Sequence, residues 1–132
     1  MNFRVLKLKP SPNQYLVAPE GLCENATPHR TAPVFSMSRE KLDALMSDLV
    51  LKQPRTRRRN VETAPGQHEF VQRTALLGFP DWITFEALEV EGGKSTLALY
   101  SRSVYGWSDL GANKKRIDGW LAKLEETVRR QG

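Results

Sequence analysis

The sequence predicts an α+β fold, a two-layer sandwich in which two helices cover an antiparallel sheet of three to five strands. Two segments repeat apolar residues at the spacing of an amphipathic helix, one beginning near residue 38 and one closing the chain. Between them, residues 56–102 alternate strand-like runs with turn motifs. Short turns favour antiparallel pairing of consecutive strands, so the predicted order is helix, strands, helix.

The amino-terminal segment is rich in proline, because five of the eight prolines fall within its first 35 residues. Each proline fixes φ and removes a hydrogen-bond donor, which excludes a helix here and allows at most an edge strand. The run "FRVLKL" at residues 3–8 is the candidate for a short strand. We therefore predict an extended arm over residues 1–33 that lies over the domain, and a single α+β domain over residues 34–132.

The first helix is predicted from a regular apolar stripe that has a clear start and a clear stop. Ser38 is a good N-cap residue, and Pro54 ends the segment because it cannot continue a helix. The apolar positions are three and four residues apart, as one face of a helix requires. They are Leu42, Leu45, Met46, Leu49 and Val50.

The strand region is divided by "GFPD" at residues 78–81 and by "EGGK" at residues 91–94, which reads as a hairpin turn. Ile83, Phe85 and Ala87 alternate to one face, as a half-buried strand requires. Leu88 and Val90 break this alternation, so we expect either a bulge or a partly covered outer face.

The second helix is predicted from an apolar stripe near the end of the chain, where five apolar residues recur at helical spacing. They are Ile117, Trp120, Leu121, Leu124 and Val128. This stripe is expected to pack on the sheet as part of the core.

The net charge of +5 is unevenly distributed along the chain. Residues 1–60 carry 11 basic and 5 acidic side chains, residues 61–101 carry 2 and 6, and residues 102–132 carry 7 and 4. This distribution does not make a continuous nucleic-acid face, although attraction to anionic surfaces stays open. The run "RTRRR" places Arg55, Arg57, Arg58 and Arg59 together. It is either a solvated, charged sheet edge or a contact for a membrane surface or acidic partner.

Metal and cofactor sites are not predicted. His29 and His68 have no second histidine or cysteine at ligand spacing, and the single Cys23 excludes an internal disulfide. No nucleophile–base pair is apparent either, which disfavours an enzyme. Neither a signal peptide nor a membrane span is apparent, so the chain as given is expected to be soluble.

An unusual polar stretch, "LYSRSVYGWSDLGANKKR" at residues 99–116, joins the last strand to the second helix. An anionic ligand could dock at the helix start, where free N–H groups and added basic residues favour negative charge. The alternative is structural: Arg102 pairs with Asp109 and holds the strand to the helix. The candidate ligand-binding residues are Arg102, Ser103, Tyr105, Ser108, Asp109, Asn113 and Arg116.

The same stretch resembles the signature of a bacterial and plastid domain-of-unknown-function family, numbered fourteen ninety-nine. The signature reads roughly S-R-x-G-x-S-D-x-G-x-N-x-x-R, and "PNQYLVAPEG", "APVFSMS" and "VQRTALLGFPDWITFEAL" resemble earlier parts of the family. The resemblance implies no established activity, substrate or cofactor. Several relatives carry an amino-terminal hydrophobic anchor, so both the cytoplasm and, after removal of such an anchor, the periplasm stay open.

The leading hypothesis is a non-enzymatic binding or accessory domain that works at the cell envelope. Its polar corner would bind an anionic small molecule, a membrane surface or a protein partner. One alternative is an enzyme of undetected class that uses Asp109 as base and Arg102 or Arg116 to stabilise an anion. Another is nucleic-acid binding through residues 55–59, which the lack of interleaved aromatic residues disfavours.

Overall fold

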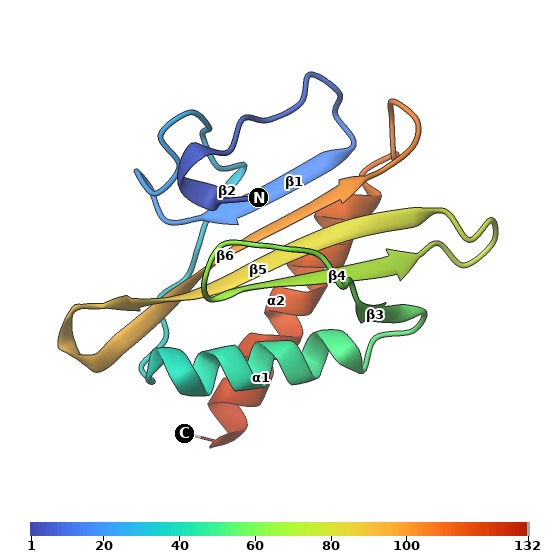
Figure 1. The fold of residues 1–132 in the computed structure, drawn as a ribbon. Coiled ribbons are helices and arrows are strands. Elements are labelled where there is room, and N and C mark those ends of the chain that lie inside the picture. The colour runs from blue at the N-terminus through green and yellow to red at the C-terminus, as the bar shows by residue number, and fades with distance from the viewer. Residues whose placement is uncertain (132) are drawn as a thin grey trace.

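The computed structural model describes residues 1–131 and has an α+β fold built on one six-stranded sheet (Figure 1). The sheet order is β2-β1-β6-β5-β4-β3. The strands are β1 (Gln14–Ala18), β2 (Arg30–Thr31), β3 (Thr56–Arg58), β4 (Gln67–Arg73), β5 (Pro80–Val90) and β6 (Lys94–Ser103). The helices are α1 (Arg39–Leu51) and α2 (Ala112–Gln131), with one-turn 3-10 helices η1 (Phe3–Val5) and η2 (Glu91–Gly93).

The α+β class and the two helices are confirmed, but the predicted number of strands is wrong, because the sheet has six rather than three to five. The sheet is also mixed rather than antiparallel, since β1 and β2 pair in parallel while the other pairs are antiparallel. Both strands of the parallel pair come from the amino-terminal segment that was predicted to be an arm.

The strand predicted at residues 3–8 is wrong, because Phe3–Val5 form η1 and the strand begins later, at Gln14. β1 lies between β2 and β6 and is not an edge strand. Pro12 and Pro19 lie on either side of β1, so the ladder keeps its donors within the strand. The prolines mark the two ends of β1, but the five-residue strand between them was not predicted.

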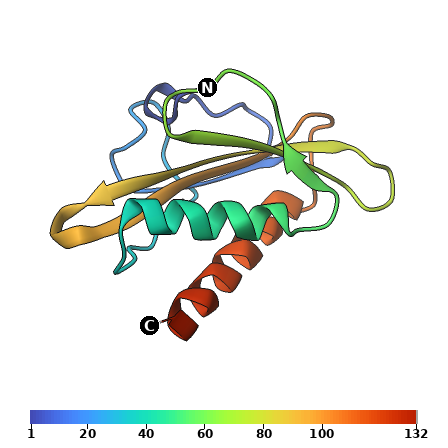
Figure 2. The ribbon, with the colours of Figure 1, turned by 60° about the horizontal axis from the view of Figure 1, so that its bottom comes forward.

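Both α-helices lie on one face of the sheet (Figure 2). Ser38 caps α1 as predicted, since its side chain accepts a hydrogen bond from the backbone N–H of Lys41 at 3.1 Å. Both predicted stripes pack into the main core. Its fully buried members include Leu42, Met46, Val50, Ile117, Leu121 and Leu124 from the helices and Phe70, Ile83, Phe85, Leu97 and Leu99 from the strands.

The amino-terminal segment covers part of the opposite face, which we call the arm side (Figures 1 and 2). Phe3 is fully buried in a second, smaller apolar cluster with Leu16, Ala98 and Tyr100. Arg4 forms an ion pair with Glu86 of β5 at 3.2 Å. Leu88 packs at the edge of this cluster, so the prediction of a partly covered outer face is confirmed. The alternative prediction, a bulge, is wrong, because β5 and β6 stay in continuous register.

The hairpin predicted at residues 91–94 is confirmed, with η2 connecting β5 to β6. At the other end of these strands, two loops, residues 74–79 and residues 104–111, leave the sheet together (Figures 1 and 2). Within residues 1–131, neither α-helix is long and apolar enough to cross a membrane.

Candidate functional site

The carboxyl end of β6 delivers neighbouring residues to opposite faces of the sheet, because successive side chains of a strand alternate. Ser101 and Ser103 contact the side covered by α2, whereas Tyr100 and Arg102 contact the arm side. The residues predicted to form one polar corner are therefore divided between two sites.

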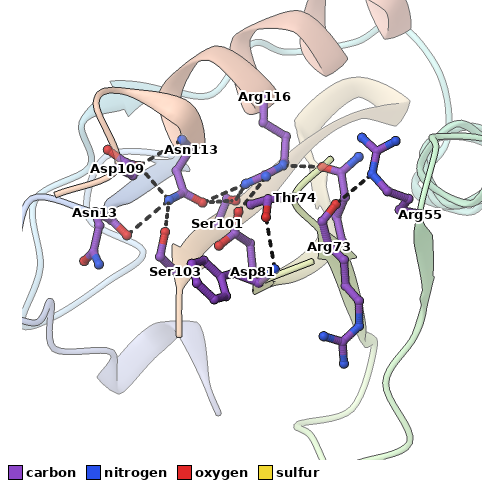
Figure 3. A network of polar contacts seen from close by, with 12 residues as sticks. Asn13, Arg55, Arg73, Thr74, Asp81, Ser101, Ser103, Asp109, Asn113 and Arg116 are labelled. Carbon is purple, nitrogen blue, oxygen red and sulfur yellow. Dashed lines mark hydrogen bonds and ion pairs between the residues drawn. The ribbon is translucent and has the colours of Figure 1, made fainter. Parts of the chain in front are cut away.

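The first site is a helix-side network around Asn113, which is fully buried in the first turn of α2 (Figure 3). Its Nδ2 donates to the backbone carbonyl of Asn13 at 3.2 Å, to Ser103 Oγ at 2.9 Å and to Asp109 Oδ2 at 2.7 Å. Its Oδ1 accepts from Ser101 Oγ at 2.6 Å. The network consists of Asn13, Gln72, Asp81, Ser101, Ser103, Asp109, Asn113 and Arg116.

Arg116 joins this network to β4 and β5 (Figure 3). Its guanidinium forms an ion pair with Asp81 at 2.6 Å, and the two side chains are only 10% and 4% exposed. It also donates to Gln72 through Nε, and to Ser101 Oγ at 3.1 Å and Asn113 Oδ1 at 2.9 Å through NH1. The ion pair is nearly buried and its guanidinium is hydrogen-bonded on several sides, the condition under which such a pair is tolerated in a protein interior.

Asp109 caps the start of α2. Its carboxylate accepts hydrogen bonds from the backbone N–H groups of Gly111 at 2.8 Å and Asn113 at 3.0 Å, as well as from the Asn113 side chain. Partial burial acts to raise the pKa of Asp109, but these hydrogen bonds from Asn113 and Gly111 outweigh it and lower the pKa. Ser108 contributes a weaker turn contact, since its Oγ accepts from the N–H of Leu110 at 3.3 Å.

The helix-side network uses its polar groups internally. Among residues 1–131, the one buried side-chain polar atom without a partner is Ser47 Oγ, which lies in α1 and outside this network. The predicted contact between Arg102 and Asp109 is wrong, because Asp109 caps α2 while Arg102 contacts Thr84 and Glu69 on the arm side. These contacts favour the structural interpretation for this part of the corner.

The second site is an arm-side pocket of about 320 Å³, in which Arg102 meets the amino-terminal segment. Arg102 donates to Thr84 Oγ1 at 2.7 Å and lies 3.8 Å from Glu69 Oε1, while Tyr100 lies beneath its guanidinium at 4.8 Å. The pocket is lined by Met1, Leu6, Lys7, Lys9, Trp82, Tyr100, Arg102, Ser103 and Val104.

Positive charge exceeds negative charge around this pocket. Glu69 accepts a shorter hydrogen bond from Arg59, at 3.1 Å, so one carboxylate serves two guanidinium groups. Lys9 adds a third cation, and its Nζ donates to the backbone carbonyl of Ser103 at 2.7 Å. Burial lowers the pKa of Lys9 and the nearby Arg102 lowers it further, while the charges of Asp109 and Asp81 partly offset this. Burial likewise lowers the pKa of Arg102, which the charge of Glu69 partly offsets.

A comparison with protein-family models matches residues 5–124 to the family described as "Protein of unknown function (DUF1499)". The chain belongs to the DUF1499 family. The resemblance found in the sequence is thereby confirmed. The family description names no activity, and neither the curated proteins nor the solved structures gave a significant match.

The arginine cluster of this DUF1499 chain divides in the same way as its polar corner. Arg58 lies over the Phe70 ring at 5.2 Å and contacts His68, whereas Arg59 pairs with Glu69 and stacks over Trp82 at 3.7 Å. Arg55 and Arg57 are exposed and line a different groove. Arg58 and Arg59 are thus engaged by side chains of the domain, and Arg55 donates to the backbone carbonyl of Arg73 at 3.0 Å.

Some residues of both sites were missed in the sequence. Asp81 continues the phase of Ile83 and Phe85, so a carboxylate at a core-facing position was a signal that a buried cation would be its partner. Lys7 and Lys9 gave no such signal, because their place beside Arg102 depends on the path of the arm. Tyr105 contributes its backbone carbonyl to Asn13, while its side chain is exposed.

The histidines of the DUF1499 chain are used in local packing. His68 contacts Asp43 of α1 at 2.8 Å and stacks on Phe85. His29 Nδ1 accepts the backbone N–H of Leu16 at 2.9 Å, and burial lowers its pKa. Within residues 1–131, histidine, cysteine and carboxylate side chains form no cluster of three that could hold a metal ion.

Proposed function

We propose that this domain is a non-enzymatic binding module whose arm-side pocket takes a small anionic ligand, carrying a phosphate or carboxylate group. The observation that carries the proposal is the surplus of positive charge in the pocket, where Lys7, Lys9 and Arg102 line the wall and the carboxylate nearest to Arg102, that of Glu69, is already engaged by Arg59. Guanidinium and ammonium groups match phosphate and carboxylate oxygens.

The shape and lining of the pocket support a ligand with an apolar part as well as a charge. Its walls include the rings of Trp82 and Tyr100 and the side chain of Leu6. Small-molecule sites combine such apolar walls with a few polar groups that fix orientation. A volume of about 320 Å³ lies at the lower end of the usual range, which favours a compact ligand such as an aryl phosphate or benzoate.

The enzyme alternative is weaker. Asp109, the predicted base, has both carboxylate oxygens occupied by N–H donors that cap α2. Arg116, the predicted anion stabiliser, is engaged by Asp81 and by three further polar groups. Neither group is free to contact a substrate without first losing contacts that stabilise the fold.

The nucleic-acid alternative is weaker as well, because Arg58 and Arg59 make contacts within the domain. Arg55 and Arg57 alone give few phosphate contacts, so binding would have only a shallow salt dependence. We also propose that the domain works at the cell envelope, which requires that it bind a membrane surface.

The test is a thermal-shift titration with inorganic phosphate, phenyl phosphate, benzoate and acetate, at ionic strength matched with chloride. A ligand at about ten times its Kd stabilises the folded state by about 1.4 kcal/mol, or roughly 5 °C in the midpoint. Phenyl phosphate or benzoate should give the largest shift. Comparison of the two distinguishes a phosphate site from a carboxylate site.

The variants Arg102→Met and Lys9→Met should lose this shift while they stay folded, because Glu69 keeps Arg59 as its partner and the contact of Lys9 is a hydrogen bond to the backbone carbonyl of Ser103. Arg129→Met, an exposed position near the far end of α2, is the matched control and should keep it. A shift that survives in both pocket variants, or the absence of a shift with all four anions, would overturn the proposal.

A further inference from the structure

Six large apolar side chains are exposed together at one end of the sheet. They lie in the two loops that leave the sheet side by side, residues 74–79 after β4 and residues 104–111 after β6 (Figures 1 and 2). Phe79 and Tyr105 join the two loops through an edge-to-face contact with ring centroids 6.3 Å apart. We call this group the apolar tip; it consists of Leu76, Leu77, Phe79, Tyr105, Trp107 and Leu110.

The exposure of the apolar tip is extreme for side chains of this size. Leu110 is 97% exposed and Leu76 is 92% exposed, and the other four are at least half exposed. Single exposed apolar residues are ordinary, but a cluster of this size on one end of a domain marks an interaction surface. None of its six residues lines the arm-side pocket, so the tip is a separate surface.

Leu110 is held outward in a conformation that its residue type disfavours. Its φ is +54°, in the left-handed region that glycine or asparagine adopts more readily. The side chain gains no packing in return, since it is almost fully exposed. Both the backbone conformation and the exposure of Leu110 therefore oppose stability, which is the pattern of a residue kept for contact with something else.

Basic side chains lie beside the tip. A groove of about 720 Å³ runs next to residues 74–78 and is lined by Arg55, Arg57 and Arg73 together with Leu76 and Leu77. Arg55 and Arg73 donate to backbone carbonyls, at 3.0 and 2.8 Å, and among residues 1–131 none of the three arginines is in an ion pair. The positive charge of these guanidinium groups is not neutralised by a carboxylate of the described residues and can therefore attract an anionic partner.

The start of α2 adds to this charge through Lys115, which is exposed in its first turn, whereas the neighbouring Lys114 forms an ion pair with Asp118 at 2.5 Å. The two loops themselves hold a single acidic side chain, Asp109, which caps α2. The surface around the apolar tip is accordingly positive.

We propose that the apolar tip and its arginines dock the domain onto the surface of a bilayer that contains anionic phospholipid. Tryptophan, tyrosine and leucine side chains on protruding loops can enter the interfacial region, where aromatic rings are enriched. The three arginines of the groove then meet lipid phosphates, and each basic residue near such a surface strengthens binding. The attachment is peripheral and requires no membrane-spanning helix.

A bilayer fits this surface better than the other occupants do. A second copy of the chain would bring the same arginines against one another, which like-charge repulsion opposes. The apolar residues lie on loops that project from the end of the sheet, a shape suited to shallow insertion (Figure 2). Charge and shape together favour an anionic lipid surface.

The experiment is co-sedimentation of the full chain with vesicles of phosphatidylcholine alone and of phosphatidylcholine with phosphatidylglycerol, at about 0.1 M salt. Binding to the anionic vesicles should be at least about tenfold stronger. Leu76→Asn combined with Leu110→Asn should weaken it by about tenfold or more, because two exposed leucines lose their insertion. The thermal midpoint of this variant should not fall, since asparagine accepts the left-handed conformation at residue 110.

Arg57→Gln tests the charged part of the surface and should weaken binding to anionic vesicles while leaving the thermal midpoint unchanged. Val34→Asn and Arg129→Gln are the matched controls, since Val34 is 59% exposed and both lie away from the tip. Both controls should bind as the parent chain does. Arg102→Met should also bind normally, which separates this proposal from the pocket proposal.

Equal binding to neutral and anionic vesicles, or binding that the double leucine variant leaves unchanged, would overturn the proposal. Sedimentation velocity without vesicles measures the oligomeric state of the chain. A dimer in the parent chain that the leucine substitutions convert to monomer would assign the apolar tip to self-association instead.

Discussion

The helix side and the arm side of the sheet each hold a nearly buried arginine, Arg116 of α2 on the helix side and Arg102 of β6 on the arm side, yet the two differ in their electrostatic surroundings. Arg116 faces Asp81 at 2.6 Å, and its remaining donors meet Gln72, Ser101 and Asn113. Arg102 has a carboxylate at 3.8 Å that is already closer to another arginine. The first arginine is balanced and the second is not.

This difference shows that buried charge alone does not identify a binding site. A network in which every donor has an acceptor stabilises one conformation of its side chains and leaves no free hydrogen-bond donor for a ligand. A site with an unbalanced cation, an open pocket and apolar walls has a reason to bind. Substitutions of residues on each side of the sheet test this difference.

The largest effect is expected from Arg116→Ala. It leaves Asp81 buried without its ion-pair partner, and such a loss costs about 3–5 kcal/mol in the free energy of unfolding. Urea denaturation followed by circular dichroism measures it. Arg102→Met is the matched comparison and should cost only about 1 kcal/mol, because Glu69 keeps Arg59. Equal losses in the two variants would remove the distinction between the sides.

A middle effect is expected from Asp109→Ala, which removes the cap of α2 and should cost about 1–2 kcal/mol at neutral pH. The pKa of Asp109 is lowered in the folded state, so its contribution is complete above the ordinary pKa of an aspartate in the unfolded chain. The contribution is lost as the pH falls through the lowered folded pKa. The gap between parent and variant should therefore narrow in acid, as urea titrations at several pH values will measure.

The control for this pH dependence is Asp48→Ala, because that carboxylate is 65% exposed on α1 and contacts only Lys52. Its small effect is that of a surface ion pair, a few tenths of a kcal/mol at most. A gap for Asp109→Ala that stays constant down to acid pH would show that the carboxylate does not act through its charged form.

The smallest effect is expected from Ser103→Ala, which tests whether the two sides are independent. The hydroxyl of Ser103 serves Asn113 on the helix side, while its backbone carbonyl accepts from Lys9 on the arm side. Loss of the hydroxyl should cost about 0.5–1 kcal/mol, because Asn113 Nδ2 keeps two other acceptors. The thermal shift with phenyl phosphate should be unchanged. A lost shift would mean that the two sites are coupled.

The helices could be predicted from the sequence because their signals are local. Ser38, Pro54 and the stripe from Leu42 to Val50 specify α1 without reference to the rest of the chain. The same holds for the hairpin at residues 91–94. β1 and β2 could not be found this way, since a five-residue strand between prolines is defined by the partner that it meets, β6, far along the chain.

The candidate residues were predicted better than their arrangement. Asn113, Arg116 and Asp109 do form one network, but Arg102 does not belong to it, because its partners are Thr84 and Glu69 rather than Asp109. Leu97 and Leu99 face the main core, and the alternation of β6 puts Arg102 on the opposite face, away from the start of α2 where Asp109 lies. The arm-side pocket was beyond prediction, because the path of residues 1–9 depends on tertiary contacts such as the burial of Phe3.

The sheet order also has a consequence for how the chain folds. β3, β4, β5 and β6 are connected in sequence by short loops and pair with their neighbours, so they can assemble as a local meander. β1 is made early but can join only when β6 is present, because their ladder brings residues 14 and 102 together. This closure has the largest entropic cost of any strand pairing in the sheet, so we expect the amino-terminal strand to dock late in refolding.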